Sequence, residues 1–293
     1  MKSILNCYAV CRTGFPFLIT FVVKSITMTL CSITWDVSPL IFSIGSFSVR
    51  WYGLLFAMSF AVGYIIMLRI FRKENLPESL LDKLSMYMLI ATVVGARLGH
   101  VFFYEWGYYS HHLDEILMVW KGGLASHGAA IGILTALYFF AQTSKRTYFW
   151  TLDRIVIVVA LSGFFIRTGN LMNSEIYGKV TNLPWGFIFV RAGETLPRHP
   201  TQIYEALCYL SIFIFLLWYY YHKNGAPREG FLFGFFLVTL FSVRFVLEFL
   251  KEPQVNFENS MALNMGQLLS IPFILAGLFI IFRKQKVNKK VDD

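Results

Sequence analysis

The chain has 293 residues, of which 56% are hydrophobic and only 15% are charged. Soluble domains carry about 25% charged residues, so this composition excludes an ordinary soluble domain and predicts a polytopic membrane protein. The net charge of +9 does not indicate nucleic-acid binding, because the basic residues lie mostly in short loops between apolar runs, as in membrane proteins that hold a fixed topology.

The first 35 residues are expected to be an N-terminal extension. Their one apolar run is shorter than the roughly 20 residues needed to cross a membrane, and it resembles the core of a signal peptide. Met28 offers a second start, so we expect residues 1–27 to be either a tail or a stretch upstream of the true start. Residues 36–50, with a turn at Gly45, are expected to lead into the membrane from the extracytoplasmic side.

Seven apolar runs follow, each long enough to cross a membrane. They are expected at about residues 51–68, 84–104, 122–142, 150–166, 201–221, 231–250 and 265–282. The sequence therefore predicts an all-α integral membrane protein with about seven transmembrane helices. Its transmembrane domain would cover residues 36–283, with an extramembrane arm at 167–200 and a basic tail at 284–293.

Lys and Arg collect after the first, third, fifth and seventh runs. Because positive residues mark the cytoplasmic side of a membrane, the pattern predicts a periplasmic N-terminus, a cytoplasmic C-terminus and an arm that faces outward. No internal repeat is visible, which weighs against an inverted-repeat transporter. The four cysteines have neither metal-ligand spacing nor a convincing disulfide framework, so we expect no metal site.

The most informative stretch is GFFIRTGNLMNSEIYG, residues 163–178. An apolar run ends there on Arg167, and Gly and Asn follow. Arginine presents a planar fork of donors that matches phosphate oxygens, asparagine adds neutral donors, and glycine lets the backbone approach a ligand. The stretch is either a site for an anionic head group or an interfacial anchor followed by an ordinary loop.

Other polar residues fall within the runs or at their ends, where they are costly and usually functional. Arg97 lies near the outer end of the second run. His127, in the third run, is surrounded by small residues that suit either catalysis or helix packing. Arg244 and Glu248 are four apart, which suits either a structural ion pair or a phosphate clamp. Tyr52 fits an ordinary aromatic belt.

Pairs of glycines four residues apart occur in both GARLG and GAAIG, at residues 95–99 and 128–132. This spacing predicts that the helices that carry them pack tightly. The polar groups together include arginines, histidines, carboxylates and amides, most of them in the predicted outer half of the membrane. We interpret them as the lining of a cavity for an anionic lipid head group, whose tails would remain in the bilayer.

Six blocks of the chain resemble one family, the bacterial prolipoprotein diacylglyceryl transferases. In order they are GARLGHVFFY, GGLASHGAAIG, RTGNLMNSEIYG, LPRHPTQIYEA, VRFVLEFLKEP and MGQLLSIP, and the resemblance extends over about residues 36–283. The family signature RxGNxxNxExxG is filled by Arg167, Gly169, Asn170, Asn173, Glu175 and Gly178. Ile166 and Ser174 stand where the family often has glycine.

The resemblance implies seven transmembrane helices with a periplasmic head, in the bacterial inner membrane. It implies that the diacylglyceryl group of phosphatidylglycerol moves to the thiol of the lipobox cysteine in a prolipoprotein signal peptide. A thioether forms and glycerol phosphate leaves. The partners would be membrane lipids and prolipoproteins, with no cofactor and no nucleic acid.

The resemblance also implies residue roles. His127 would be the essential histidine, and Arg167 and Arg244 would bind the lipid phosphate. The other candidate substrate-binding residues are Tyr52, Arg97, Asn170, Asn173, Glu175, Gly178, Glu205 and Glu248. This is chemically coherent, because a histidine can accept the thiol proton and arginines stabilise a leaving phosphate.

Two other functions use the same residues. An anion transporter or channel would use the arginines as its substrate site, and it would need a continuous polar path and, on expectation, repeat symmetry. A non-catalytic lipid-binding scaffold would tolerate alanine at position 127.

Overall fold

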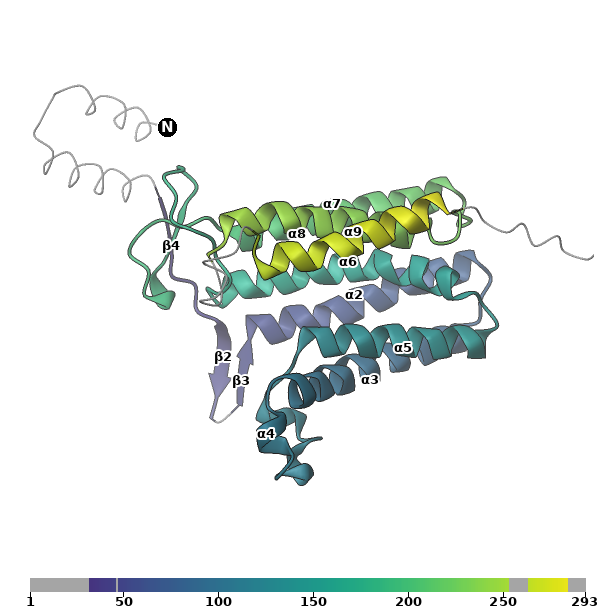
Figure 1. Ribbon diagram of the computed structural model, residues 1–293, viewed down its shortest axis with the longest axis horizontal. Helices are drawn as coiled ribbons and strands as arrows, with labels where there is room; N and C mark the ends of the chain where they lie inside the picture. Colours follow the sequence, from purple (N-terminus) through teal and green to yellow (C-terminus); the bar gives the residue numbers. More distant parts are fainter. Residues whose placement is uncertain (1–31, 46, 253–262, 284–293) are drawn as a thin grey trace, which may run out of the picture. The chain divides into compact units, whose positions relative to one another are not determined.

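The computed structural model describes residues 32–45, 47–252 and 263–283 (Figure 1). Its long helices are α2 (Trp51–Lys73), α3 (Glu78–Phe103), α5 (Ser126–Ser144), α6 (Tyr148–Met172), α7 (Thr201–His222), α8 (Phe231–Leu247) and α9 (Met265–Phe282). The shorter elements are the helix α4 (Trp106–Tyr109), the 3-10 turns η2 (Leu113–Glu115), η3 (Val119–Lys121), η4 (Val190–Ala192) and η5 (Glu248–Leu250), and the strands β1 (Ile33–Trp35), β2 (Leu40–Ile44), β3 (Phe47–Arg50) and β4 (Phe187–Phe189). The predicted basic tail and most of the predicted N-terminal extension lie outside the described residues.

Six helices of the described part are long and apolar enough to cross a membrane: α2, α3, α6, α7, α8 extended through η5, and α9. The prediction of a mostly helical, polytopic membrane protein is therefore confirmed. The third predicted run forms α5, which has 19 residues but is not among the six. Polar residues near its two ends, Ser126, His127 and Gln142, lower the mean hydropathy of α5.

The all-α prediction missed four short strands. β1 pairs in parallel with β4, so that Trp35 lies opposite Phe189, and the Trp35 indole donates to the Leu171 carbonyl at 3.1 Å. The strand β1 lies in the predicted N-terminal extension, so the folded part of the chain begins before residue 36. β2 and β3 form an antiparallel hairpin whose turn contains Gly45 at a φ of +59°.

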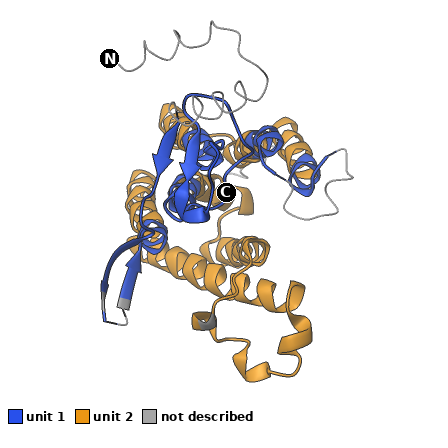
Figure 2. Cartoon of the chain, turned by 90° about the vertical axis from the view of Figure 1, so that its left-hand side faces the viewer, with its two compact units in different colours: residues 1–57, 163–209, 241–271 blue, residues 58–162, 210–240, 272–293 orange. Residues whose placement is uncertain are grey.

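The chain divides into two compact units (Figure 2). Unit 1 consists of residues 1–57, 163–209 and 241–271, and it includes the strands and the arm. Unit 2 consists of residues 58–162, 210–240 and 272–293, and it includes α3, α4 and α5. Several long helices pass from one unit into the other.

In unit 1, a small apolar core joins the strands to the end of α6. Leu171, Phe187 and Phe189 are buried together, and Trp35 and Tyr177 pack against them. The ring of Tyr177 stacks on that of Phe189, with ring centroids 4.9 Å apart. This core fixes the arm next to the signature segment, because Leu171 lies in that segment.

In unit 2, α3 and α5 pack backbone to backbone along the predicted glycines. A Cβ atom added at Gly128 would lie 2.3 Å from the carbonyl oxygen of Gly95 and 2.5 Å from the Cα of Gly99. One added at Gly132 would lie 2.7 Å from the carbonyl oxygen of Ala91. Real Cβ atoms do not come so close to backbone atoms, so only glycine permits this packing.

A largely buried carboxylate joins three helix ends at the other end of unit 2. Glu74, just after α2, accepts hydrogen bonds from Arg154 Nε at 3.0 Å, from the Tyr220 hydroxyl at 2.6 Å and from the Trp150 indole at 3.0 Å. Asp153 accepts from the backbone N–H groups at the start of α8 at 2.7 and 2.8 Å, as a helix-capping residue does. These contacts fix the ends of α2, α6, α7 and α8 to one another.

We predict that Gly128→Val destabilises the protein, because the new side chain meets backbone that cannot move aside cheaply. Overpacking of this kind costs about 1–3 kcal/mol. The measurement is the midpoint of thermal unfolding in detergent. Gly107→Ala is the matched control, since a Cβ atom at Gly107 meets nothing within 4 Å. Equal midpoints for the two variants would contradict the glycine packing.

Candidate functional site

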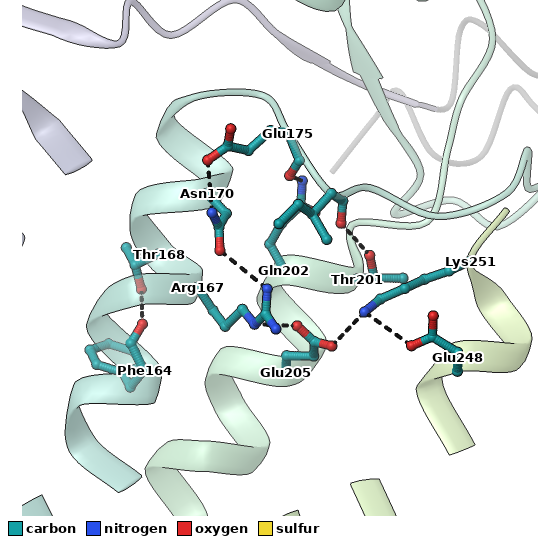
Figure 3. Close-up of polar contacts among 11 residues, drawn as sticks. Phe164, Arg167, Thr168, Asn170, Glu175, Thr201, Gln202, Glu205, Glu248 and Lys251 are labelled. Carbon is teal, nitrogen blue, oxygen red and sulfur yellow. Dashed lines mark hydrogen bonds and ion pairs between the residues drawn. The ribbon is translucent and has the colours of Figure 1, made fainter. Parts of the chain in front are cut away.

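Arg167 and Glu205 are the centre of the polar cluster in unit 1 (Figure 3). Arg167 Nε lies 2.5 Å from Glu205 Oε2, and its Nη1 donates to Asn170 Oδ1 at 3.3 Å. The guanidinium also donates to the hydroxyl of Tyr209, one turn after Glu205 on α7. The helix α6 continues to Met172, six residues beyond the predicted end of the run, so Arg167 and Asn170 share one helical face.

Glu205 is fully buried and also binds a second cation, Lys251. The Lys251 ammonium lies 2.8 Å from Glu205 Oε1 and 3.5 Å from Glu248 Oε2. A chain of alternating charges therefore runs from Arg167 through Glu205 and Lys251 to Glu248 (Figure 3). Buried charges are stable only when paired in this way.

The sequence left open whether Arg244 and Glu248 form a structural ion pair or a phosphate clamp, and the described residues show no ion pair between the two. The helix α8 ends at Leu247, and Glu248 begins the 3-10 turn η5. Glu248 binds Lys251 instead. Arg244 is half-buried in unit 1, interacts electrostatically with Tyr209, and has no ion-pair partner among the described residues.

Lys251 is a functional candidate that the sequence analysis does not name. Its side chain is only 6% exposed. The signal was its spacing of three residues from Glu248, which suits an ion pair but is common in any chain. The second partner, Glu205, is 46 residues away and could not be inferred from spacing.

The loop after α6 is organised around the carboxylate of Glu175. Asn170 Nδ2 and Asn173 Nδ2 donate to Glu175 Oε1 at 2.7 and 3.2 Å, and Gln202 Nε2 donates to the Glu175 carbonyl at 2.6 Å. The two signature asparagines therefore hold the carboxylate in place. Ser174 has a φ of +54°, a conformation that favours glycine, which explains in physical terms why glycine suits this position.

Two signature glycines lie where a side chain would not fit. A Cβ atom at Gly169 would lie 2.8 Å from Cδ2 of Tyr52, so Tyr52 packs directly on the signature helix. A Cβ atom at Gly178 would lie 2.6 Å from the carbonyl oxygen of Leu250. Gly178 thus brings the loop against the end of η5, close to the segment that carries Lys251.

Arg198 fixes the arm to the same segment. It forms ion pairs with Glu194 and Glu252, each at 2.6 Å. Tyr177 donates to Glu194 at 2.8 Å, and burial, followed by this hydrogen bond, raises the pKa of the Tyr177 hydroxyl. Burial lowers the pKa of His199 in the arm, so His199 is neutral at pH 7.

The other two predicted residues, Arg97 and His127, belong to unit 2. The Arg97 guanidinium is buried and donates to three backbone carbonyls, those of Glu115, Ile116 and Gly122, at 2.6 to 2.8 Å. His127 is the second residue of α5 and is exposed, and its imidazole has no hydrogen-bond partner among the described residues.

The polar cluster around Glu205 therefore contains Arg167, Lys251 and Arg244, and carboxylates pair with the first two. Among the described residues Arg244 has no counter-ion, and Arg167 binds neutral groups as well as Glu205. Such an arrangement can bind an anion without losing its own structure. Within the described residues, no group of three or more His, Cys, Asp or Glu side chains could hold a metal ion.

These features define a polytopic membrane protein in which arginine, lysine and carboxylate side chains gather at the ends of α6, α7 and α8. The family model described as prolipoprotein diacylglyceryl transferase matches residues 39–283, and the chain belongs to this family. The resemblance inferred from the sequence is thereby confirmed.

Three relatives illustrate how closely the chain follows the family. It is 46% identical over 255 residues to a phosphatidylglycerol–prolipoprotein diacylglyceryl transferase of Chloroherpeton thalassium, covering 87% of this chain and 95% of that protein. It is 46% identical over 253 residues to the protein of the same name from Tolumonas auensis, covering 86% and 97%. It is 43% identical over 269 residues to that of Porphyromonas gingivalis, covering 87% and 95%.

We predict that Lys251→Met destabilises the protein, because it leaves Glu205 and Glu248 buried without the cation between them. Breaking a buried ion pair costs about 3–5 kcal/mol, which would appear as a lower midpoint of thermal unfolding in detergent. Lys251→Arg keeps the charge and should retain most of the stability. If the Met variant unfolds at the same temperature as the unaltered protein, Arg167 alone suffices to pair Glu205.

Proposed function

We propose that this membrane transferase moves the diacylglyceryl group of phosphatidylglycerol to the lipobox cysteine of prolipoproteins. The thiol sulfur attacks the glyceryl carbon, the carbon–oxygen bond to phosphate breaks, and glycerol phosphate leaves with the negative charge. The products are a thioether-linked diacylglyceryl group and glycerol phosphate. The main support is the family match over residues 39–283, together with a partly buried signature arginine that is held by Glu205 and Asn170.

Arg167 and Arg244 are proposed to bind the lipid phosphate. Arginine offers two parallel donors to phosphate oxygens, and in a site shielded from water these donors stabilise the charge that develops on the leaving group. Glu205 orients Arg167, while Lys251 balances the second oxygen of Glu205. The asparagines and Glu175 brace the loop beside Arg167, and Tyr52, packed on Gly169, is proposed to contact the lipid.

His127 is proposed to accept the proton of the lipobox thiol. Only a few per cent of a cysteine with a pKa of about 8.5 is thiolate at neutral pH, so a nearby base accelerates the attack. The exposed imidazole at the start of α5, unengaged by other described residues, is free to do this.

We also propose that α5 is a seventh span, that the protein lies in the bacterial inner membrane, and that the arm at residues 167–200 faces the periplasm. The support is the alternation of basic loops along the sequence, together with the location of the signature site beside this arm.

The function is tested by incubating the purified protein with phosphatidylglycerol and a peptide that contains a lipobox. Mass analysis of the peptide should show an added diacylglyceryl group on cysteine, and a Cys→Ser peptide is the control. No added mass on the cysteine peptide would contradict the transferase function.

We predict that Arg167→Lys lowers turnover at least tenfold while the protein still inserts and folds. Lysine keeps the charge but cannot bind Glu205, Asn170 and a phosphate at once through a planar fork. The measurement is the rate of peptide modification, with membrane insertion checked separately. Near-normal turnover would mean that Arg167 serves only as an anchor.

We predict that His127→Gln loses turnover but still binds phosphatidylglycerol, because glutamine roughly keeps the size and hydrogen bonding but cannot accept the proton. Part of the lost rate should return as the pH rises toward the thiol pKa of about 8.5, since the thiolate then forms without a base. The measurement is a pH profile of peptide modification. Weakened lipid binding without alkaline recovery would instead make His127 a residue that positions the lipid.

We predict that reporter fusions after Lys223 and after Lys290 both report the cytoplasm, because basic residues follow the fifth and seventh predicted runs. A periplasmic signal after Lys290 would contradict the proposed orientation.

A further inference from the structure

Arg97 is a buried cation whose partners are backbone carbonyls of a single segment. Arg97 is 1% exposed. Its Nε donates to the Ile116 carbonyl at 2.8 Å, its Nη1 to the Gly122 carbonyl at 2.6 Å and its Nη2 to the Glu115 carbonyl at 2.7 Å. The guanidinium also lies 4.9 Å from the centre of the Tyr109 ring. All three nitrogens are therefore engaged before any ligand arrives.

The bound carbonyls belong to the segment between α3 and α5, which is fitted closely against the end of α3. Gly122 and Gly123 have φ values of +85° and +71°, and a Cβ atom at Gly123 would lie 2.3 Å from the His100 ring and 3.1 Å from Nη1 of Arg97. Two residues further on, the Ala125 N–H donates to the Ala96 carbonyl at 2.9 Å.

These contacts fix the start of α5 from both sides of His127. Arg97 and the Ala125 hydrogen bond hold the chain before it, and Gly128, in backbone contact with Gly99, holds the chain after it. Because the His127 imidazole has no partner among the described residues, its location depends on the backbone that carries it.

We propose that Arg97 is a positioning residue for the transferase reaction: it acts through the 115–125 segment to hold His127, and it does not bind the lipid phosphate itself. The inference rests on the proposed function of His127. It changes the role expected for Arg97 from the sequence, where an arginine near the outer end of a span was interpreted as a substrate ligand.

Arginine suits this role better than lysine does. The three carbonyl oxygens approach the side chain from different directions. A guanidinium can bind all of them at once, because its N–H groups are fixed in one plane and point outward in different directions. A lysine ammonium donates all its hydrogen bonds from one nitrogen atom at the end of a flexible stem. It cannot hold all three carbonyls in the directions that the guanidinium fixes, so the segment would loosen.

The test compares Arg97→Lys with the unaltered protein in three measurements: kcat and KM for phosphatidylglycerol, the pH profile, and hydrogen exchange of residues 115–125. We expect kcat to fall at least tenfold and KM to change less than twofold. Exchange in the segment should become faster, and part of the rate should return at alkaline pH, as for His127→Gln. Gly123→Ala keeps the arginine at position 97 but forces a methyl group against the His100 ring and Arg97 Nη1, so it should displace the same segment and give the same pattern.

The matched control is Arg154→Lys, because Arg154 is also a buried arginine of unit 2 that donates to a carbonyl, that of Gly225 at 3.1 Å. It should lower the unfolding temperature without changing kcat or the exchange of residues 115–125. A rise in KM with unchanged exchange in Arg97→Lys would make Arg97 a direct lipid ligand and overturn the proposal. Unchanged kcat with faster exchange would also overturn it. Absence of transfer by the unaltered protein would overturn the proposed function itself.

Discussion

The site in unit 1 depends on the sharing of one buried carboxylate between two cations. Glu205 has no exposed surface, and its two oxygens face Arg167 and Lys251 separately. An ionised carboxylate at such a place is stable only if both oxygens are paired. The arrangement fixes the guanidinium of Arg167 at the end of α6, and it ties the signature segment to the end of α8 through Lys251.

Four arginines that are buried or partly buried have chemically different partners. Among the described residues Arg97 binds backbone carbonyls and an aromatic ring, so it holds a segment of backbone in place. Arg154 binds Glu74 and a carbonyl, so it joins helix ends. Arg167 binds a carboxylate, an amide and a hydroxyl, while Arg244 has no ion-pair partner in the described part of the chain. The nature of the partners separates residues that hold the fold from residues with charge available for a ligand.

Much of this could be predicted from the sequence, because apolar runs and the signature blocks are local patterns. Six of the seven predicted spans, the glycine packing of α3 on α5 and the family were accessible in this way. The strands were missed because three to five residues give too little periodicity to outweigh an apolar background. The role of Lys251 was missed because a spacing of three from Glu248 is common in any chain, and because its closer partner, Glu205, is 46 residues away.

The contacts of Glu74 have a consequence for how the chain assembles. Its partners Arg154 and Tyr220 follow it by 80 and 146 residues in the sequence. At a synthesis rate of about 5–20 residues per second, Glu74 leaves the ribosome on the order of ten seconds before its last partner. During that interval the first helix hairpin carries an unpaired carboxylate at its turn, where water or lipid head groups must solvate it. The end of α2 can therefore become fixed only after α7 has been made, so the helices reach their final arrangement late in synthesis.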